Sequence, residues 1–170
     1  MPKMGVSRVG ILRVLMLAGA LAMPFAPQVG MAQSDGPFAI FSGNWRGSGQ
    51  VTGTNGNRER ITCRANYTIS SGGQALSQSL TCASDSYRFD VRSSVNNDGD
   101  DVRGEWEETT RNVKGNLLGQ IANGQFDGKI TGSGFSAEMS LQTNNGKQQV
   151  SISPHGANVS KVEIELSREK

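Results

Sequence analysis

Few side chains in this sequence have the types and spacing that catalysis needs. The chain contains one histidine, His155, and two cysteines, Cys63 and Cys82. His155 stands in a Ser-Pro-His-Gly stretch typical of a turn, so neither a Cys-His pair nor a Ser-His-Asp triad is predicted. No spacing of histidine and cysteine matches a metal site. We therefore expect no catalytic residues, no metal and no enzyme activity, although two carboxylates alone would suffice for glycoside hydrolysis.

A stretch that begins at Ser94 partly resembles a calcium-binding loop. Asn96, Asp98, Gly99 and Glu105 occupy its third, fifth, sixth and twelfth positions, but serine replaces the first acidic ligand. The flanking sequence has a strand pattern and not a helical one. Because Asn-Asp-Gly-Asp is also a strong hairpin-turn sequence, we interpret this stretch as a turn.

A small-molecule site is a further candidate. Gln78 and Glu108 fall on the face that the strand pattern places inward, where a lone carboxylate is costly. Aromatic residues on the same face would complete a mainly apolar cavity with few polar contacts, as small-molecule sites have. The alternative is that Glu108 lies in water at a strand end and the aromatic rings fill the core. The candidate ligand-binding residues are Trp45, Tyr67, Gln78, Tyr87, Phe89, Trp106 and Glu108.

The N-terminus predicts export. Three basic residues precede an almost unbroken apolar run over 14–22, which is shorter than the roughly 20 residues that span a bilayer. Small residues at Gly30 and Ala32 suit cleavage between Ala32 and Gln33. A retained membrane anchor is the alternative. We expect a cleaved signal peptide, no membrane anchor, and a periplasmic or secreted protein.

The predicted organisation is a signal peptide over 1–32, a flexible lead-in over 33–37 and one domain over 38–170. The whole chain has 17 Lys and Arg against 15 Asp and Glu, and three of the basic residues lie in the signal. The mature chain therefore has 14 against 15, a net charge of −1. We see no basic stripe in it and expect neither nucleic acid nor an anionic membrane as a partner.

From Phe38 onward the sequence predicts an all-β domain. Glycine and asparagine recur roughly every 8–12 residues, with alternating apolar and polar residues between them. Short loops make neighbours in sequence neighbours in space. Such a meander tends to close, because an open one leaves two exposed edges. We expect an antiparallel up-and-down barrel or flattened clam of about ten strands, with a two-sheet β-sandwich as the runner-up.

The turn at Gly72-Gly73 predicts a disulfide. Taken as a two-residue loop, it places Cys63 opposite Cys82. Opposed Cα atoms in antiparallel strands lie about 4.5–5.5 Å apart, which a disulfide tolerates. Two cysteines in an exported chain are usually bonded to each other. The bond would protect the register against a one-residue slip, which would turn every side chain to the other face.

All four glycine-containing turns place apolar residues opposite each other. The pairs are Ile69 with Leu76 around Gly72-Gly73, Val95 with Val102 and Val91 with Trp106 around Asp98-Gly99, Ile121 with Phe126 around Asn123-Gly124, and Leu141 with Val150 around Asn145-Gly146. The Asp98-Gly99 register also places Glu108 opposite Phe89.

The run 43–49, Gly-Asn-Trp-Arg-Gly-Ser-Gly, resembles the start of calycin-type β-barrels. It contains the Gly-x-Trp of lipocalins and, more closely, the Gly-x-Trp-x-Gly-x-Gly of nitrobindin-like haem barrels. The chain as a whole resembles a group of uncharacterised exported proteins of alphaproteobacteria. These resemblances imply a calycin-like barrel and export.

The haem chemistry of nitrobindin-like barrels is not expected here. Those proteins follow the glycines with an aromatic residue and proline, whereas Gln50-Val51 follows here. They also need a wall histidine near the C-terminus that a partner side chain orients. His155 reads instead as a turn residue, so we expect no cofactor.

Two functions agree with the sequence. The first is an exported barrel that binds a small, partly apolar ligand in its interior. The second is a non-enzymatic envelope protein with a filled core that acts through its surface, with a periplasmic protein as a possible partner. Its surface would be the outward arginines, but interleaved acids predict ordinary cross-strand charge pairs instead. These arginines are Arg58, Arg60, Arg64, Arg88, Arg92 and Arg103.

Overall fold

The computed structural model describes residues 36–170. The predicted signal peptide and its cleavage site lie outside the described residues, as do the first three residues of the predicted lead-in. The described end of the lead-in is held by the barrel. Gly36 donates its backbone N–H to the carbonyl of Gly72 (2.9 Å), and Phe38 donates to that of Gly73 (3.1 Å).

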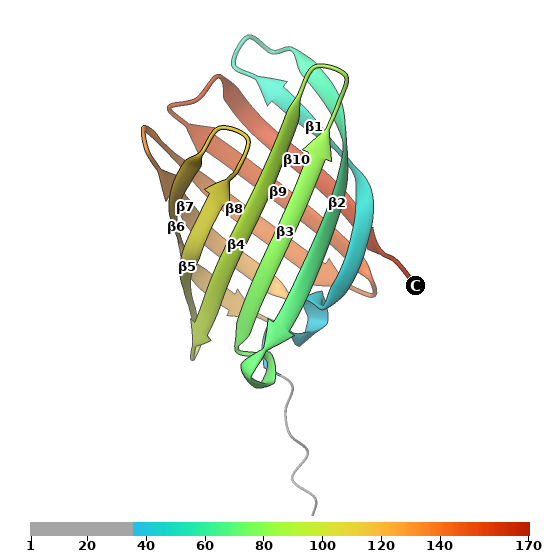
Figure 1. Cartoon of the computed structure of the whole chain (residues 1–170), viewed down its shortest axis with the longest axis vertical. Coiled ribbons are helices and arrows are strands. Elements are labelled where there is room, and N and C mark those ends of the chain that lie inside the picture. Colours follow the sequence, from blue (N-terminus) through green and yellow to red (C-terminus); the bar gives the residue numbers. More distant parts are fainter. Residues whose placement is uncertain (1–35) are drawn as a thin grey trace, which may run out of the picture. The chain divides into compact units, whose positions relative to one another are not determined.

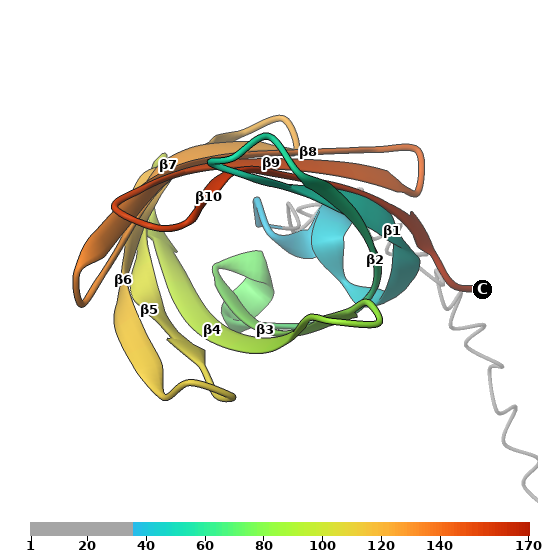
Figure 2. The same cartoon turned by 90° about the horizontal axis from the view of Figure 1, so that it is seen from above.

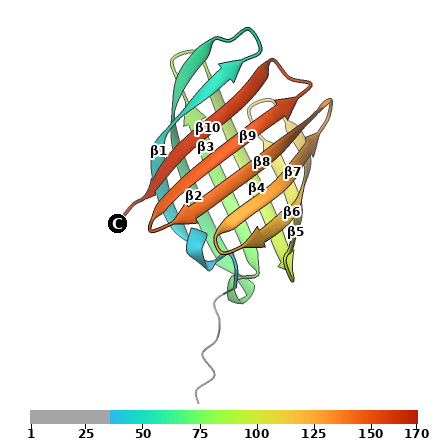
Figure 3. The ribbon, with the colours of Figure 1, turned by 180° about the vertical axis from the view of Figure 1, so that it is seen from behind.

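Ten antiparallel strands close into one barrel, which confirms the predicted architecture and excludes the sandwich. Each strand pairs with its sequence neighbours, and the first pairs with the last (Figures 1 and 3). The strands are β1 (Gly43–Gly53), β2 (Arg58–Ser70), β3 (Ala75–Ala83), β4 (Arg88–Asp98), β5 (Asp101–Glu108), β6 (Val113–Ala122), β7 (Gln125–Gly132), β8 (Phe135–Asn144), β9 (Lys147–His155) and β10 (Val159–Arg168).

Closure between β1 and β10 depends on glycine. Gly47 and Gly49 lie opposite Leu166 and Ile164. A Cβ on Gly47 would lie only 1.8 Å from the carbonyl oxygen of Glu165. The two backbones therefore approach as closely as they do only because these positions lack side chains.

Three of the four predicted registers are confirmed, including the pairing of Cys63 with Cys82. The loop at Gly72-Gly73 is longer than predicted, because Ser70 pairs with Ala75 and a short 3-10 turn, η2 (Ser71–Gly73), lies between. The register survives because the longer loop is centred on the same two glycines.

The predicted register at Asp98-Gly99 is wrong by two residues. Asp98 pairs with Asp101, so the loop residues are Gly99 and Asp100, and Glu108 lies opposite Val91 instead of Phe89. Gly99 has a φ of 68°, whereas Asp100 does not have a positive φ. This is the pattern of a type II′ turn with glycine first, whereas the prediction took Asp98 and Gly99 as the two loop residues, with glycine second. A two-residue shift keeps every side chain on its predicted face.

The disulfide is confirmed: Cys63 and Cys82 are bonded, with their Cα atoms 4.2 Å apart. Both cysteines are fully buried on the inward face.

One end of the barrel is closed and packed. A 3-10 turn, η1 (Ala39–Phe41), lies inside this end, as the view along the barrel shows (Figure 2). Phe38 and Phe41 are 3% exposed and join the inward side chains of the strands in one core. We call this the closed end. The other end, where the loops 54–57, 84–87, 109–112 and 156–158 lie, is called the open end.

Candidate functional site

An apolar cavity of about 300 Å³ lies at the open end. Its aromatic lining comes from Tyr87, Phe89, Trp106 and Phe135, and valines from β1, β6 and β10 complete the wall. Most inward residues near the closed end are buried, whereas several inward residues that line this cavity, such as Val51, Phe89 and Val162, are only half-buried. The side chains of the open half therefore leave part of the barrel interior unfilled.

Glycines on the neighbouring strands hold the Trp106 ring flat against the wall. A Cβ on Gly115 would lie 2.8 Å from Nε1 of Trp106, and one on Gly132 would lie 2.9 Å from Cζ2. The indole N–H donates to the carbonyl of Thr131 (3.1 Å), and the ring of Phe135 packs edge-on at 5.5 Å. The largest ring of the cavity thus lines the wall and leaves the centre free.

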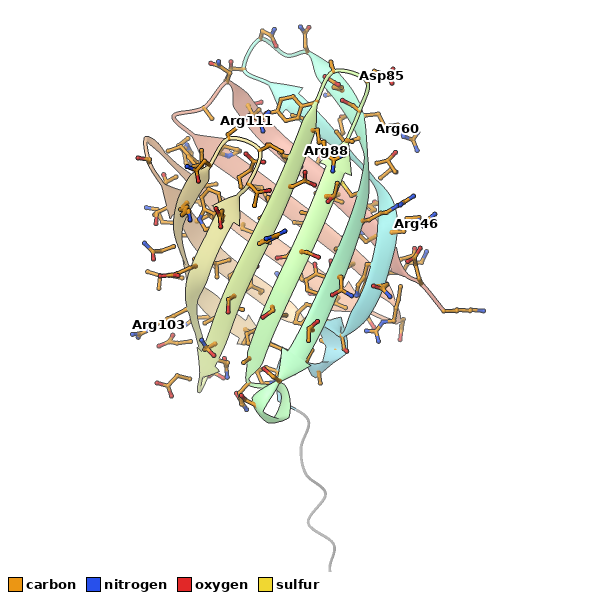
Figure 4. The ribbon with its side chains drawn as sticks, viewed as in Figure 1. Arg46, Arg60, Asp85, Arg88, Arg103 and Arg111 are labelled. Carbon is orange, nitrogen blue, oxygen red and sulfur yellow. A yellow bond between two sulfur atoms is a disulfide. The ribbon has the colours of Figure 1, made fainter. Side chains whose placement is uncertain are left out.

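The rim of the cavity carries one cation. The guanidinium of Arg111 lies over the ring of Tyr87, 5.0 Å from its centroid, and Tyr87 packs edge-on against Phe89 at 6.1 Å. Figure 4 labels Arg111 at the open end of the barrel. Its Nη1 donates to the carbonyl of Arg88 (3.3 Å) and lies 3.4 Å from Oε2 of Glu108.

Glu108 lines the cavity, but its carboxylate accepts hydrogen bonds mainly from the neighbouring 109–112 loop. The backbone amides of Asp90 (3.1 Å), Thr110 (3.1 Å) and Arg111 (2.8 Å) donate to it, and so does the hydroxyl of Thr110. Burial by itself would raise the pKa of Glu108. The hydrogen bonds from Thr110, Asp90 and Arg111 together outweigh burial and hold the pKa below its usual range. Glu108 therefore fastens the 109–112 loop as an anion.

Replacing Glu108 with glutamine should lower the free energy of unfolding by about 1–2 kcal/mol at pH 7, because an amide NH₂ cannot accept from backbone N–H groups. A lowered folded pKa stabilises the protein above the unfolded value near 4.5. That contribution is lost as pH falls through the folded pKa. Urea unfolding from pH 7 to pH 3 should thus show the wild type and the variant converging on acidification.

Glu138→Gln is the matched control, because Glu138 is an exposed carboxylate on the outer face of β8. It should leave the free energy of unfolding within about 0.5 kcal/mol of the wild type. A constant difference between Glu108→Gln and the wild type across this pH range would contradict the assigned role.

The predicted site residues divide between the two halves of the barrel. Four of them, Tyr87, Phe89, Trp106 and Glu108, line the open-end cavity together. Tyr67 and Gln78 instead line a smaller cavity of about 50 Å³ on the closed side.

The closed-side residues are held by polar contacts within the core. The hydroxyl of Tyr67 donates to Oε1 of Gln148 (2.8 Å), whose amide donates to the hydroxyl of Thr143 (3.0 Å). Burial raises the pKa of the Tyr67 hydroxyl, so it remains a neutral donor. Gln78 accepts a hydrogen bond from Ser93 (2.9 Å).

Trp45 has a structural position. It is fully buried, donates its indole N–H to the carbonyl of Phe41 (2.7 Å), and is covered by the guanidinium of Arg168 at 4.8 Å. Arg168 also donates to the carbonyl of Ile40. These contacts connect the start of β1, the end of β10 and η1 at the closed end of the barrel.

Sequence reasoning missed several residues of the cavity. Phe135 shares the inward parity of Met139 and Leu141, so alternation along its strand was a usable signal. Arg111 and Ala157 lie in loops, where alternation gives no information, and only the barrel shows that they border the cavity.

Residues 36–170 include no group of three or more His, Cys, Asp or Glu side chains arranged to hold a metal ion. His155 is exposed at the end of β9, opposite Ser136, next to the loop that leads to β10. Within this same part of the chain, no helix has the length and apolar character needed to cross a membrane.

The chain is similar in structure to two solved barrels. The crystal structure of Rv2717c from M. tuberculosis matches with a TM-score of 0.64 at 9% identity, over 78% of this chain and 94% of that chain. The S-type phycobiliprotein lyase CPES from Guillardia theta matches with a TM-score of 0.56 at 12% identity, over 78% and 90%. The sequence matches no protein-family model and no curated protein. At such low identities the likeness shows only a shared fold, a closed ten-stranded β-barrel.

Proposed function

We propose that this chain is an exported, non-catalytic protein that binds a small, largely apolar ligand in its open-end cavity. The observation that carries the proposal is the cavity itself. Its volume of about 300 Å³ lies at the lower end of the usual range for ligand sites, about 300–1,000 Å³. Its lining is mainly apolar, with a cation at the rim, so a ligand with an apolar body fits it.

The contrast between the two halves supports a role in binding. An apolar cavity costs stability, because the groups that line it lose packing contacts. At the closed end the same chain leaves a cavity of only about 50 Å³. The glycines under Trp106 keep its ring out of the larger space. An unfilled half therefore reflects a requirement other than stability.

The proposal also includes export from the cytoplasm and a role without catalysis. The buried disulfide suits an oxidising compartment. One structural neighbour is named a phycobiliprotein lyase, and from it we take only that such a barrel can act on another molecule. Native mass spectrometry of the protein from its host periplasm should show cleavage before Gln33, and an added ligand mass that is lost on denaturation.

A titration with N-phenyl-1-naphthylamine, a neutral dye that fluoresces in apolar surroundings, tests the cavity directly. Val162→Trp places a large ring in the cavity and should weaken dye binding about tenfold or more. Leu118→Trp makes the same kind of change at a side chain that is 54% exposed on the outer wall, and should bind as the wild type does. Equal affinity in Val162→Trp and the wild type, with both proteins folded, would overturn the proposal.

A further inference from the structure

The charged side chains of the outer surface are sorted by type. The outward positions of the contiguous strands β1–β4 carry arginine as their only cation, and Asp90 and Asp98 as their acids. The lysines of the strands all lie on β6–β10. The exposed arginines of β1–β4 are Arg46, Arg58, Arg60, Arg64, Arg88 and Arg92. The outward acids of the other strands are Asp101, Glu105, Glu107, Asp127, Glu138, Glu163 and Glu165.

Cross-strand charge pairing does not account for this surface. Arg88 pairs with Asp90 (3.0 Å), and Arg46 pairs with Glu169 (2.8 Å). Among residues 36–170, the other four arginines of β1–β4 form no ion pair within 4.0 Å, although Glu107 lies opposite Arg92 and is held by Lys114. We call these four the arginine face: Arg58, Arg60 and Arg64 on β2, and Arg92 on β4.

The arginine face borders a strip of hydroxyl groups. Strand β3 runs between β2 and β4, and its outward residues are Ser77, Ser79 and Thr81. Arg64 lies opposite Thr81, and Arg92 lies opposite Ser79. In Figure 4, Arg60 on β2 and Arg88 on β4 project from the outside of this wall. A chain lying along β3 would therefore meet Arg64 on one side and Arg92 on the other, with the hydroxyl groups of Ser77 and Ser79 beneath it. The hydroxyl of Thr81 donates to Asp90 (2.5 Å), whose carboxylate also borders this path.

The clustering of arginines on this face does not stabilise the fold. Arg46 and Arg64 lie directly opposite each other, and like charges in that position are destabilising. Solubility alone would be served as well by lysine. Arginine differs in its planar fork of donors, which binds carboxylate or phosphate oxygens two at a time.

We propose that the arginine face binds an anionic polysaccharide, a glycan that carries carboxylates along its chain. Charge complementarity and the hydroxyl strip favour it, because serine and threonine hydroxyls form hydrogen bonds with sugar hydroxyls. A protein partner would need large apolar anchors. Among the residues that the structure describes, the exposed large apolar ones, Ile40, Tyr87 and Leu118, all lie outside this face. The site lies on the outer wall, so it is independent of the cavity at the open end.

Polygalacturonate, an anionic glycan, and pullulan, a neutral one, are the probes, and binding to the disulfide-bonded mature protein is measured by calorimetry. Wild type should bind polygalacturonate, more weakly as salt rises, and should not bind pullulan. The triple variant Arg60→Gln, Arg64→Gln, Arg92→Gln should bind polygalacturonate about tenfold more weakly or worse. These side chains are exposed, so the fold should survive, and circular dichroism checks it.

The matched control is Lys129→Gln, Lys147→Gln, Lys161→Gln, which removes the same charge from the other side of the barrel. It should retain affinity within about twofold. Equal losses of polygalacturonate affinity in the two triple variants would show that binding depends only on net charge, and would overturn the proposal. No binding of polygalacturonate by the wild type would also overturn it, as would tighter binding to phosphatidylglycerol vesicles or to double-stranded DNA.

Discussion

Replacing Trp45 with alanine should lower the free energy of unfolding by about 3–5 kcal/mol, the usual loss for a buried tryptophan. Trp45 is fully buried and fixes η1 through its hydrogen bond to Phe41. The variant would leave a cavity at the closed end, an unpaired carbonyl and an Arg168 without its ring. Because domains of this size are stable by only about 5–15 kcal/mol, this one change removes a large part of the total.

Trp106→Ala is the matched control. Trp106 is the other tryptophan of the chain, but it is half-buried and borders a cavity that is already open. Its removal should cost only about 1–2 kcal/mol. Urea unfolding followed by far-UV circular dichroism compares the two variants without relying on tryptophan fluorescence. Equal losses would show that the closed end is no better packed than the open one.

Replacing both Cys63 and Cys82 with alanine should lower the free energy of unfolding by about 2–3 kcal/mol. The cysteines are 19 residues apart, and closing such a loop in the unfolded chain gives an upper value of about 3 kcal/mol. The local hairpin reduces this value if it persists in the unfolded chain.

Urea unfolding with and without dithiothreitol measures the contribution of the disulfide. The reductant should bring the wild type close to the double variant and leave the variant unchanged. Because both cysteines are fully buried, reduction of the folded protein should be slow and should accelerate near the unfolding midpoint. A double variant as stable as the oxidised wild type would show that the bond contributes nothing.

The two proposed sites depend on different side chains of the same barrel. A ligand in the cavity depends on the inward residues of the open half, whereas a glycan on the arginine face depends on the outward residues of β2–β4. Val162→Trp should leave polygalacturonate binding unchanged, and the arginine variant should leave dye binding unchanged. The strands present both surfaces because successive side chains point to opposite faces.

The face on which most strand residues lie follows from the amino-acid sequence alone. Alternation has a period of two, and a turn sets register within a few residues of itself, so both are local properties. This is why the barrel, the pairing of Cys63 with Cys82 and three registers could be predicted. The register predicted at Asp98-Gly99 was wrong because Asp98-Gly99 and Gly99-Asp100 are both acceptable two-residue loops. The sequence alone did not distinguish them.

Which inward residues contact each other depends on how the strands pack in three dimensions. Gln78 and Phe89 share the inward face, but Phe89 pairs with Cys82, four residues further along β3, or about 13 Å at the usual rise per residue. They therefore line different cavities. The height of a residue in the barrel, the plug formed by η1 and the rim loops all depend on contacts between segments far apart in sequence.

The arginine face shows the same division. The arginines are separated from one another by other residues, with Glu59 between Arg58 and Arg60, so no basic run is visible in the sequence. The pairing of β2, β3 and β4 brings the arginines together, and the closed barrel places the lysines and most of the acids on other strands. Local alternation determines which side chains point outward, but only the order of the strands determines which of them become neighbours.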